Sequence, residues 1–234
     1  MDAVTPYPRL LPAGDSAVLV ELGAEIDPSL NQRVHDLATA IARRAFRGLI
    51  AVVPGYASLL VHYDPLHVRA DEVLVLLGER LAGSARPERR RGRLREVPTC
   101  YGGVHGPDLE NVAALHGLAV DEVVRLHSEP TYLVYFLGFA PGFAYMGEVP
   151  RTIATPRLET PRTSVPAGSV GIAGTQTGVY AVSTPGGWRL LGRTPLRLFD
   201  PRRDPPTFFL PGDRVRFVPI DDAEFRRLER RGDA

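Results

Sequence analysis

The stretch from Val165 to Asp200 constrains the fold of this chain more than any other. Two runs rich in β-forming residues, Val179 to Ser183 and Trp188 to Phe199, flank the turn sequence Thr184-Pro185-Gly186-Gly187. Four glycines come before these runs: Gly168, Gly171, Gly174 and Gly178. Short β runs with frequent glycine predict a small closed barrel, in which glycines occupy bulges and corners.

The same glycines could instead bring the backbone close to a bound ligand, with Gln176, Trp188 and Arg193 supplying contacts. A P-loop needs a lysine after its second glycine, but all 28 basic residues here are arginine. The dinucleotide fingerprint G-x-G-x-x-G is also absent. Contacts to an anion must therefore come from arginine or from the backbone, and the sequence leaves both roles open for the glycines.

The first third of the chain shows a regular alternation of β runs and helical patterns. Asp27 offers an N-cap and Pro28 the first helical position. The runs are Arg9 to Leu11, Ser16 to Leu22, the helix from Asp27 to Gly48, Leu49 to Val53, Ser58 to Tyr63, and a helix from about Ala70 to Leu81. The order ββαββα predicts a two-layer α+β domain over residues 1–82, with two helices on one face of a four-stranded sheet.

Residues 83–95 interrupt this pattern. The segment GSARPERRRGRLR holds six arginines, one glutamate and no apolar run before Leu94. We interpret it as a solvated linker between two domains. The alternative is a basic patch that faces a partner.

A second domain is expected over residues 96–219. Two short helices, around residues 106–116 and 121–127, precede a region from Pro130 onward that is almost entirely β. An aromatic turn, Gly138 to Tyr145, lies within that region. Residues 220–234 are expected to form a short charged helix and tail.

Composition excludes several classes of protein. A net charge of +1 gives no reason to expect nucleic acid or a membrane surface as a partner. The single cysteine, Cys100, excludes an internal disulfide and a thiolate zinc cluster. His105, His116 and His127 are eleven residues apart, which is not the spacing of zinc ligands on a helix, so no metal site is expected. The chain shows no signal-peptide pattern and no membrane-spanning run, which makes the cytoplasm the expected location.

Five long motifs in fixed order resemble one family along nearly the whole chain. They are CYGGVHGPDLE (Cys100 to Glu110), YFLGFAPGFAYMG (Tyr135 to Gly147), TPRLETPRTSVPAGSVGIAGTQTGVY (Thr155 to Tyr180), TPGGWRLLGRTP (Thr184 to Pro195) and PGDRVRF (Pro211 to Phe217). The family is that of the B subunit of the prokaryotic ATP-dependent 5-oxoprolinase. It includes allophanate hydrolase subunit 1 and the sporulation-kinase inhibitor, and it resembles half of the carboxyltransferase domain of urea carboxylase.

The resemblance implies an N-terminal α+β domain followed by a cyclophilin-like β-barrel. It also implies two partners, the C and A subunits of 5-oxoprolinase, in a complex that opens the lactam of 5-oxoproline to glutamate. That complex would consume ATP, which binds together with magnesium. The chain alone would be inactive. The chain has no biotin attachment site. Two alternatives within the family are a subunit of an allophanate- or urea-processing biotin system and an inhibitor of a sensor histidine kinase.

Opening a stable lactam with ATP requires groups that bind anions, groups that donate hydrogen bonds, and a base. Arg157, Arg162 and Arg193 are the candidates for the anion contacts, and their alternative role is to brace the barrel through salt bridges. The other candidates for substrate or ATP binding are Gln176, Gly174 and Trp188. His105 and Tyr101, in a glycine-bracketed loop, are the catalytic candidates. The aromatic residues Phe139, Phe143, Tyr145 and Trp188 are expected to form core or pocket wall.

Overall fold

The computed structural model describes residues 6–83 and 92–232. These residues form two compact units, within residues 1–90 and 91–234, and each unit has its own hydrophobic core. Residues 84–91, most of the predicted linker, lie outside the described residues, and the linker stays a prediction.

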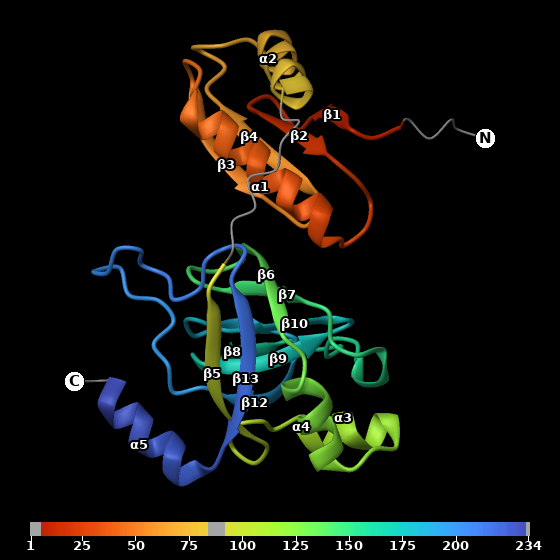
Figure 1. Cartoon of the computed structure of the whole chain (residues 1–234), viewed down its shortest axis with the longest axis vertical. Coiled ribbons are helices and arrows are strands. Elements are labelled where there is room, and N and C mark those ends of the chain that lie inside the picture. The colour runs from red at the N-terminus through yellow and green to blue at the C-terminus, as the bar shows by residue number, and fades with distance from the viewer. Residues whose placement is uncertain (1–5, 84–91, 233–234) are drawn as a thin grey trace. The chain divides into compact units, whose positions relative to one another are not determined.

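The first unit contains one sheet and two helices (Figure 1). Its strands are antiparallel and follow the order β1-β2-β4-β3. Its elements are β1 (Arg9–Pro12), β2 (Ala17–Glu21), α1 (Pro28–Arg43), β3 (Leu49–Pro54), β4 (Ser58–Tyr63) and α2 (Ala70–Gly83).

Helix α1 begins where the sequence predicts. A side-chain oxygen of Asp27 accepts hydrogen bonds from the backbone N–H groups of Ser29 and Leu30, each at 2.9 Å, and so satisfies two donors at the start of the helix. One face of α1 buries Val34, Leu37 and Ile41 in a core shared with the sheet and α2. Burial of this apolar stripe is what holds the helix on the sheet.

The second unit contains a closed barrel and helices that accompany it. Its elements are β5 (Leu94–Tyr101), α3 (Leu109–His116), α4 (Val120–Ser128), β6 (Tyr132–Leu137), β7 (Ala144–Gly147), the 3₁₀ turn η1 (Arg151–Ile153), β8 (Arg162–Val165), β9 (Ser169–Ala173), β10 (Gln176–Val179), β11 (Thr184–Gly186), β12 (Arg189–Arg193), β13 (Arg214–Ile220) and α5 (Asp222–Gly232).

Seven of these strands close the barrel in the order β10-β7-β6-β13-β5-β12-β9, and β9 pairs with β10. The first and last strands of the unit, β5 and β13, pair in parallel, whereas the other pairs are antiparallel. Strands β8 and β11 form a separate antiparallel pair. The expectation of a mixed α and β protein with a closed barrel is confirmed.

Two predicted strands differ from the structure. The run from Trp188 to Phe199 is a strand only over Arg189–Arg193. The Thr194 N–H still donates to the carbonyl of Gly168 at 2.9 Å, but the next residue, Pro195, has no N–H to continue the ladder. The strand predicted at residues 179–183 lies earlier, over Gln176–Val179, where it pairs with both β7 and β9.

The glycines of the stretch from Val165 to Asp200 serve the barrel in two ways. Gly174 has a φ of +58° in the turn between β9 and β10, a conformation that favours glycine. Gly171 and Gly178 face each other in the ladder, and a Cβ on either would lie 2.9 Å from a carbonyl oxygen of a neighbouring segment. Close backbone packing therefore accounts for these glycines without a ligand.

Candidate functional site

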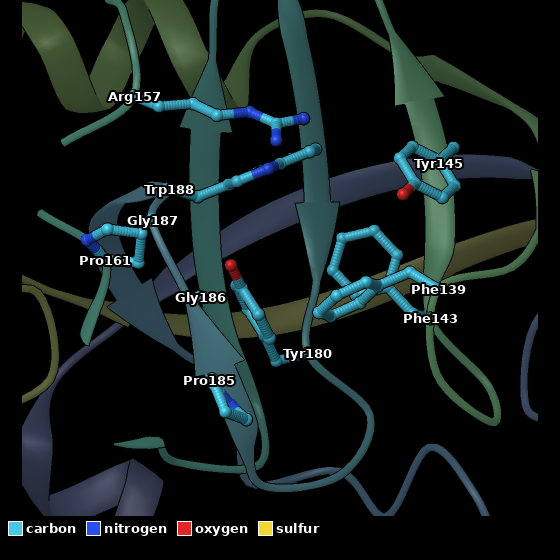
Figure 2. Close-up of a pocket in the computed structure, with 10 residues that line it drawn as sticks. All are labelled: Phe139, Phe143, Tyr145, Arg157, Pro161, Tyr180, Pro185, Gly186, Gly187 and Trp188. Carbon is cyan, nitrogen blue, oxygen red and sulfur yellow. The ribbon is translucent and has the colours of Figure 1, made fainter. Parts of the chain in front are cut away.

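A cavity of about 250 Å³ opens on the barrel unit where several connecting segments meet (Figure 2). Arg157 and Pro161 come from the segment between η1 and β8, and Tyr180 follows β10. Trp188 lies between β11 and β12. The full lining is Phe139, Phe143, Tyr145, Arg157, Pro161, Tyr180, Pro185, Gly186, Gly187 and Trp188.

The wall of this cavity is a set of interlocked aromatic rings. Phe143 is almost fully buried, and its ring centroid lies 5.2 Å from that of Tyr180 and 5.4 Å from that of Trp188, with interplanar angles of 77° and 90°. The Tyr145 ring lies 4.9 Å from Phe143 at 66°. These edge-to-face arrangements are the favoured geometry for aromatic pairs, so the rings brace one another.

Phe139 lies at the rim with an unusual backbone. Its φ is +68°, and it is the one non-glycine residue with positive φ in the described part of the chain. Its side chain is 62% exposed, although its ring packs edge-on to Phe143 and Tyr180. A strained backbone that holds an exposed aromatic ring beside a cavity indicates a functional surface.

Arg157 provides the positive charge of the cavity. Its guanidinium carbon lies 6.0 Å from the centre of the Trp188 ring, and Figure 2 shows the two groups stacked at one end of the cavity. Among the described residues the guanidinium has no hydrogen-bond or ion-pair partner, so its donors are available to a ligand.

Two phenol groups add polar contacts. Burial raises the pKa of Tyr145 and of Tyr180 above the ordinary value of 10, and the charge of Arg157 opposes this shift in both. Both hydroxyls therefore stay protonated at neutral pH. The cavity thus combines an apolar wall, one guanidinium and two phenol groups.

In the structure, Arg162 forms the kind of salt bridge that was expected to brace the barrel. Its guanidinium donates to a side-chain oxygen of Asp108 at 2.7 Å, while the other oxygen of Asp108 accepts from the backbone N–H of Leu190 at 2.7 Å. The pair is mostly buried and joins β8 to β12 through the start of α3. A role of Arg162 in ligand binding stays a prediction, and the contact with Asp108 occupies its guanidinium group.

The remaining candidates for binding, apart from Trp188, lie away from this cavity. Arg193 lines a second cavity near α5, where its Nε donates to the carbonyl of Ala167 at 2.8 Å. Gln176 begins β10, and Gly174 lies in the turn before it. Neither Gln176 nor Gly174 lines the first cavity.

Tyr101 belongs to a buried polar chain inside the barrel unit. Its hydroxyl lies 2.8 Å from Nδ1 of His127, and Nε2 of His127 lies 2.9 Å from the hydroxyl of Thr177. Thr177 donates its own proton to the carbonyl of Gly171 at 3.1 Å. The Thr177 oxygen must therefore accept from an Nε2–H, which leaves Nδ1 to accept from Tyr101.

His127 and Tyr101, the two ionisable residues in this series of hydrogen bonds, are both held neutral. Burial lowers the pKa of His127 to about 3 and raises that of Tyr101 well above 10. The geometry therefore favours a structural role for Tyr101, whose catalytic role remains a prediction.

His105, the other catalytic candidate, contacts the C-terminal helix. Its Nε2 lies 3.0 Å from a carboxylate oxygen of Asp222, and its ring centroid lies 4.3 Å from that of Phe225. It does not line the first cavity, and its catalytic role likewise remains a prediction.

Sequence reasoning assigned no role to Tyr180, although its hydroxyl lies beside Gly186 at the cavity. It placed Phe139, Phe143 and Tyr145 as core or wall, without assigning them to a site. The available signal was an aromatic residue directly after a glycine or one residue later, as in Gly142-Phe143, Gly178-Val179-Tyr180 and Gly187-Trp188. In the residues that the structure describes, no group of three or more His, Cys, Asp or Glu side chains could hold a metal ion, and no helix is long and apolar enough to cross a membrane.

Comparison with known proteins gives consistent results. The family model for the carboxyltransferase domain, subdomain C and D, matches residues 8–209. The B subunit of 5-oxoprolinase from Bacillus subtilis (strain 168) is 46% identical over 222 residues, which cover 91% of this chain and 92% of that protein. The B subunit from Escherichia coli O157:H7 is 44% identical over 209 residues, which cover 88% of this chain and 93% of that protein.

Two solved structures share the fold. The crystal structure of TTHA0988 is 38% identical with a TM-score of 0.76, and the match covers 88% of this chain but only 40% of that longer chain. The crystal structure of the K. lactis urea amidolyase has a TM-score of 0.79 at 20% identity, covering 96% of this chain and 15% of that chain. At that identity the likeness shows the fold alone.

Proposed function

Because this chain belongs to the family of the carboxyltransferase domain, subdomain C and D, we propose that it is a subunit of a 5-oxoprolinase complex, which opens the 5-oxoproline lactam to L-glutamate. Relatives named as the B subunit of 5-oxoprolinase, at 40 to 46% identity over most of the chain, support this function. Urea amidolyase is the alternative among the relatives, but it is only 24% identical to this chain.

The first cavity is where this chain contacts 5-oxoproline. The substrate is a small five-membered ring with one carboxylate, and a cavity of about 250 Å³ accommodates it. The ring packs on the aromatic wall formed by Phe143, Tyr180 and Trp188. Its carboxylate pairs with Arg157, because a guanidinium matches a carboxylate in both charge and planar geometry. The Tyr180 hydroxyl donates to the lactam oxygen.

The residues that line the first cavity indicate that the chain does not act alone. Its lining contains no carboxylate, imidazole or thiol, so the described residues there provide no base to activate water. They can bind and orient the ring and exclude water from one side of it. The base must therefore come from another part of the complex.

ATP, with magnesium, is the second reactant of the proposed reaction. Its role is to supply the phosphoryl group that activates the otherwise unreactive lactam oxygen. One guanidinium beside an apolar wall does not suit a triphosphate, so the first cavity is a poor fit for ATP. The nucleotide must therefore bind outside the first cavity.

Partners, location and barrel type complete the proposal. The C and A subunits of 5-oxoprolinase, which the family resemblance implies, join this chain in a complex in the cytoplasm, and the barrel is cyclophilin-like. The match to only 40% of the TTHA0988 chain supports the partnership, because there the equivalent region accompanies further protein in one polypeptide.

The test is reconstitution with purified subunits. Glutamate release from 5-oxoproline is measured with this chain alone, with the C subunit, and with the A and C subunits together, each with and without ATP. We expect release only from the full mixture with ATP. Robust release by the chain alone would overturn the proposal that it needs partners, and no release from the full mixture would overturn the function.

A variant at Arg157 tests the proposed substrate site separately from the function of the complex. Arg157→Ala should lower activity of the complex about tenfold or more, the scale of one lost charge-assisted contact of about 1.5–3 kcal/mol, with an unchanged melting temperature. Arg151→Ala is the matched control, because Arg151 is an exposed arginine of the preceding turn η1 that does not line the cavity. Equal activity of the Arg157→Ala and Arg151→Ala complexes would contradict the proposal that the first cavity binds the substrate.

A further inference from the structure

A second cavity of about 440 Å³ lies on the barrel unit and shares no lining residue with the first. It opens beside the end of β12, and α5 contributes Glu229 to its wall. Two arginines, Arg193 and Arg197, line it together with the hydroxyl residues Ser183 and Thr194. Phe199 and smaller apolar residues complete the lining.

Arg193 is held in place before any ligand arrives. Its Nε donates to the Ala167 carbonyl at 2.8 Å, and its guanidinium carbon lies 5.7 Å from the centre of the buried Phe225 ring. Within the described residues the two terminal nitrogens have no hydrogen-bond acceptor. Such a fixed guanidinium with free donors suits a precise anion contact, because little side-chain freedom is lost on binding.

In the loop that follows, three arginines gather around one aspartate. Asp200 is buried, and Arg202 donates to both of its carboxylate oxygens at 3.1 Å. Arg197 and Arg203 each lie 3.7 Å from the same carboxylate. The hydrogen bond from Arg202 holds the pKa of Asp200 well below its ordinary value, so the carboxylate stays ionised and fixes the loop. The charged groups of the cavity lining itself are two guanidinium groups, Arg193 and Arg197, and one carboxylate, Glu229, so the lining is net positive.

We propose that this second cavity binds the polyphosphate chain of a magnesium-bound nucleotide. Phosphate oxygens fit the guanidinium groups of Arg193 and Arg197, and this chain has no lysine to do the same work. The cavity volume falls in the range of small-molecule sites, and its apolar part beside Phe199 accommodates a base or ribose. Glu229 is the carboxylate that would face the magnesium ion, which proteins usually bind through one or two carboxylates and substrate phosphates.

This inference rests on the proposed function, because that reaction consumes ATP. It goes beyond it by placing the nucleotide on this chain rather than on a partner. It also separates two functions within one barrel unit, with the ring of 5-oxoproline at the first cavity and the nucleotide at the second.

The test measures binding to the full chain without its partners. Isothermal titration is carried out with magnesium ATP and, separately, with inorganic tripolyphosphate. We expect magnesium ATP to bind one to one, and tripolyphosphate to bind at the same site more weakly, because it cannot reach the apolar part. Equal affinity for the two would overturn the assignment of a nucleotide while leaving a polyphosphate site. The absence of any binding would overturn the proposal.

Three variants make the test specific. Arg197→Ala should raise the dissociation constant at least threefold, and Arg193→Ala at least tenfold. Arg197 is half-exposed and makes only a long ion pair, so its variant should fold normally even if Arg193→Ala does not. Arg125→Ala is the matched control, because Arg125 is equally exposed and pairs with glutamates on α4 and at its end. Similar affinity in Arg197→Ala, Arg125→Ala and the parent would place the nucleotide elsewhere.

The two proposals can fail separately. If the full mixture of subunits releases glutamate but this chain alone does not bind magnesium ATP, the second site is wrong and the function stands. If the chain binds magnesium ATP through Arg193 and Arg197 but the mixture releases no glutamate, the nucleotide site stands and the 5-oxoprolinase function is wrong.

Discussion

Lowering the pH from 7 to 5 should destabilise the barrel unit through His127, by an amount that its burial sets. The ring is fully buried between Tyr132 and Phe217, with centroid distances of 5.7 and 4.7 Å. Its two nitrogens contact only the hydroxyls of Tyr101 and Thr177. The surrounding groups therefore offer no negative charge to a protonated ring.

The sign of the effect follows from the two protonation states. In the unfolded chain the histidine has the ordinary pKa of 6.5, whereas burial lowers the pKa in the folded protein to about 3. Below pH 6.5 the unfolded state gains a proton that the folded state does not accept. The stabilising effect is therefore full above pH 6.5 and is lost progressively as the pH falls towards 3.

One pKa unit corresponds to about 1.4 kcal/mol, and pH 5 lies about 1.5 units below the unfolded pKa, so the loss between pH 7 and pH 5 is about 2 kcal/mol. Most carboxylates titrate below this window. Comparison with a variant that lacks only His127 removes the contribution of every other titratable group.

The variant is His127→Gln, which retains one donor and one acceptor but does not titrate. Urea unfolding is followed by fluorescence of Trp188, the only tryptophan in the chain, so the signal reports the barrel unit. The parent should lose about 2 kcal/mol more than His127→Gln between pH 7 and pH 5. His116→Gln is the control and should keep the full loss, because His127 remains. Equal losses in the parent and in His127→Gln would refute the reasoning.

Two further substitutions test the roles of single groups. Arg162→Ala leaves the buried carboxylate of Asp108 without its ion-pair partner. We expect urea unfolding to show a barrel unit that is less stable by roughly 3 kcal/mol or more. An unchanged unfolding midpoint would contradict the bracing role and return Arg162 to the candidates for ligand binding. Gly186→Ala places a Cβ 2.4 Å from the Tyr180 hydroxyl and must displace that ring from the first cavity. Activity per folded reconstituted complex should therefore fall, and a folded variant with normal activity would argue against the cavity.

Local signals in the sequence predicted most of the elements. The Asp27-Pro28 pair marked the start of α1, and the predicted helix at residues 70–81 appears as α2 (Ala70–Gly83). These features succeed because caps and apolar periodicity are properties of neighbouring residues. The prediction of one strand from Trp188 to Phe199 failed because the composition of this run favours a strand throughout, whereas Pro195 has no N–H to continue the ladder beyond Arg189–Arg193.

The site was predicted less well, because its parts come together only through tertiary pairing. Trp188 and Arg157 were chosen as separate residues, and nothing local indicated that they stack. Tyr101 and His127 are 26 residues apart, and Arg162 and Asp108 are 54 apart, yet each pair forms a direct contact. Tyr101 looked like a candidate for catalysis because its partner could not be seen.

The parallel pairing of β5 with β13 affects how the protein can fold while it is being synthesised. Residues that pair across this junction, such as Glu96 and Arg216, are 120 positions apart, so the barrel cannot close until the ribosome has released nearly all of the chain. The first unit pairs neighbouring strands and can fold earlier. A nascent barrel without β13 leaves the edges of β5 and β6 unpaired. We therefore expect chains that stop before Arg214 to aggregate rather than to accumulate as a shorter folded protein.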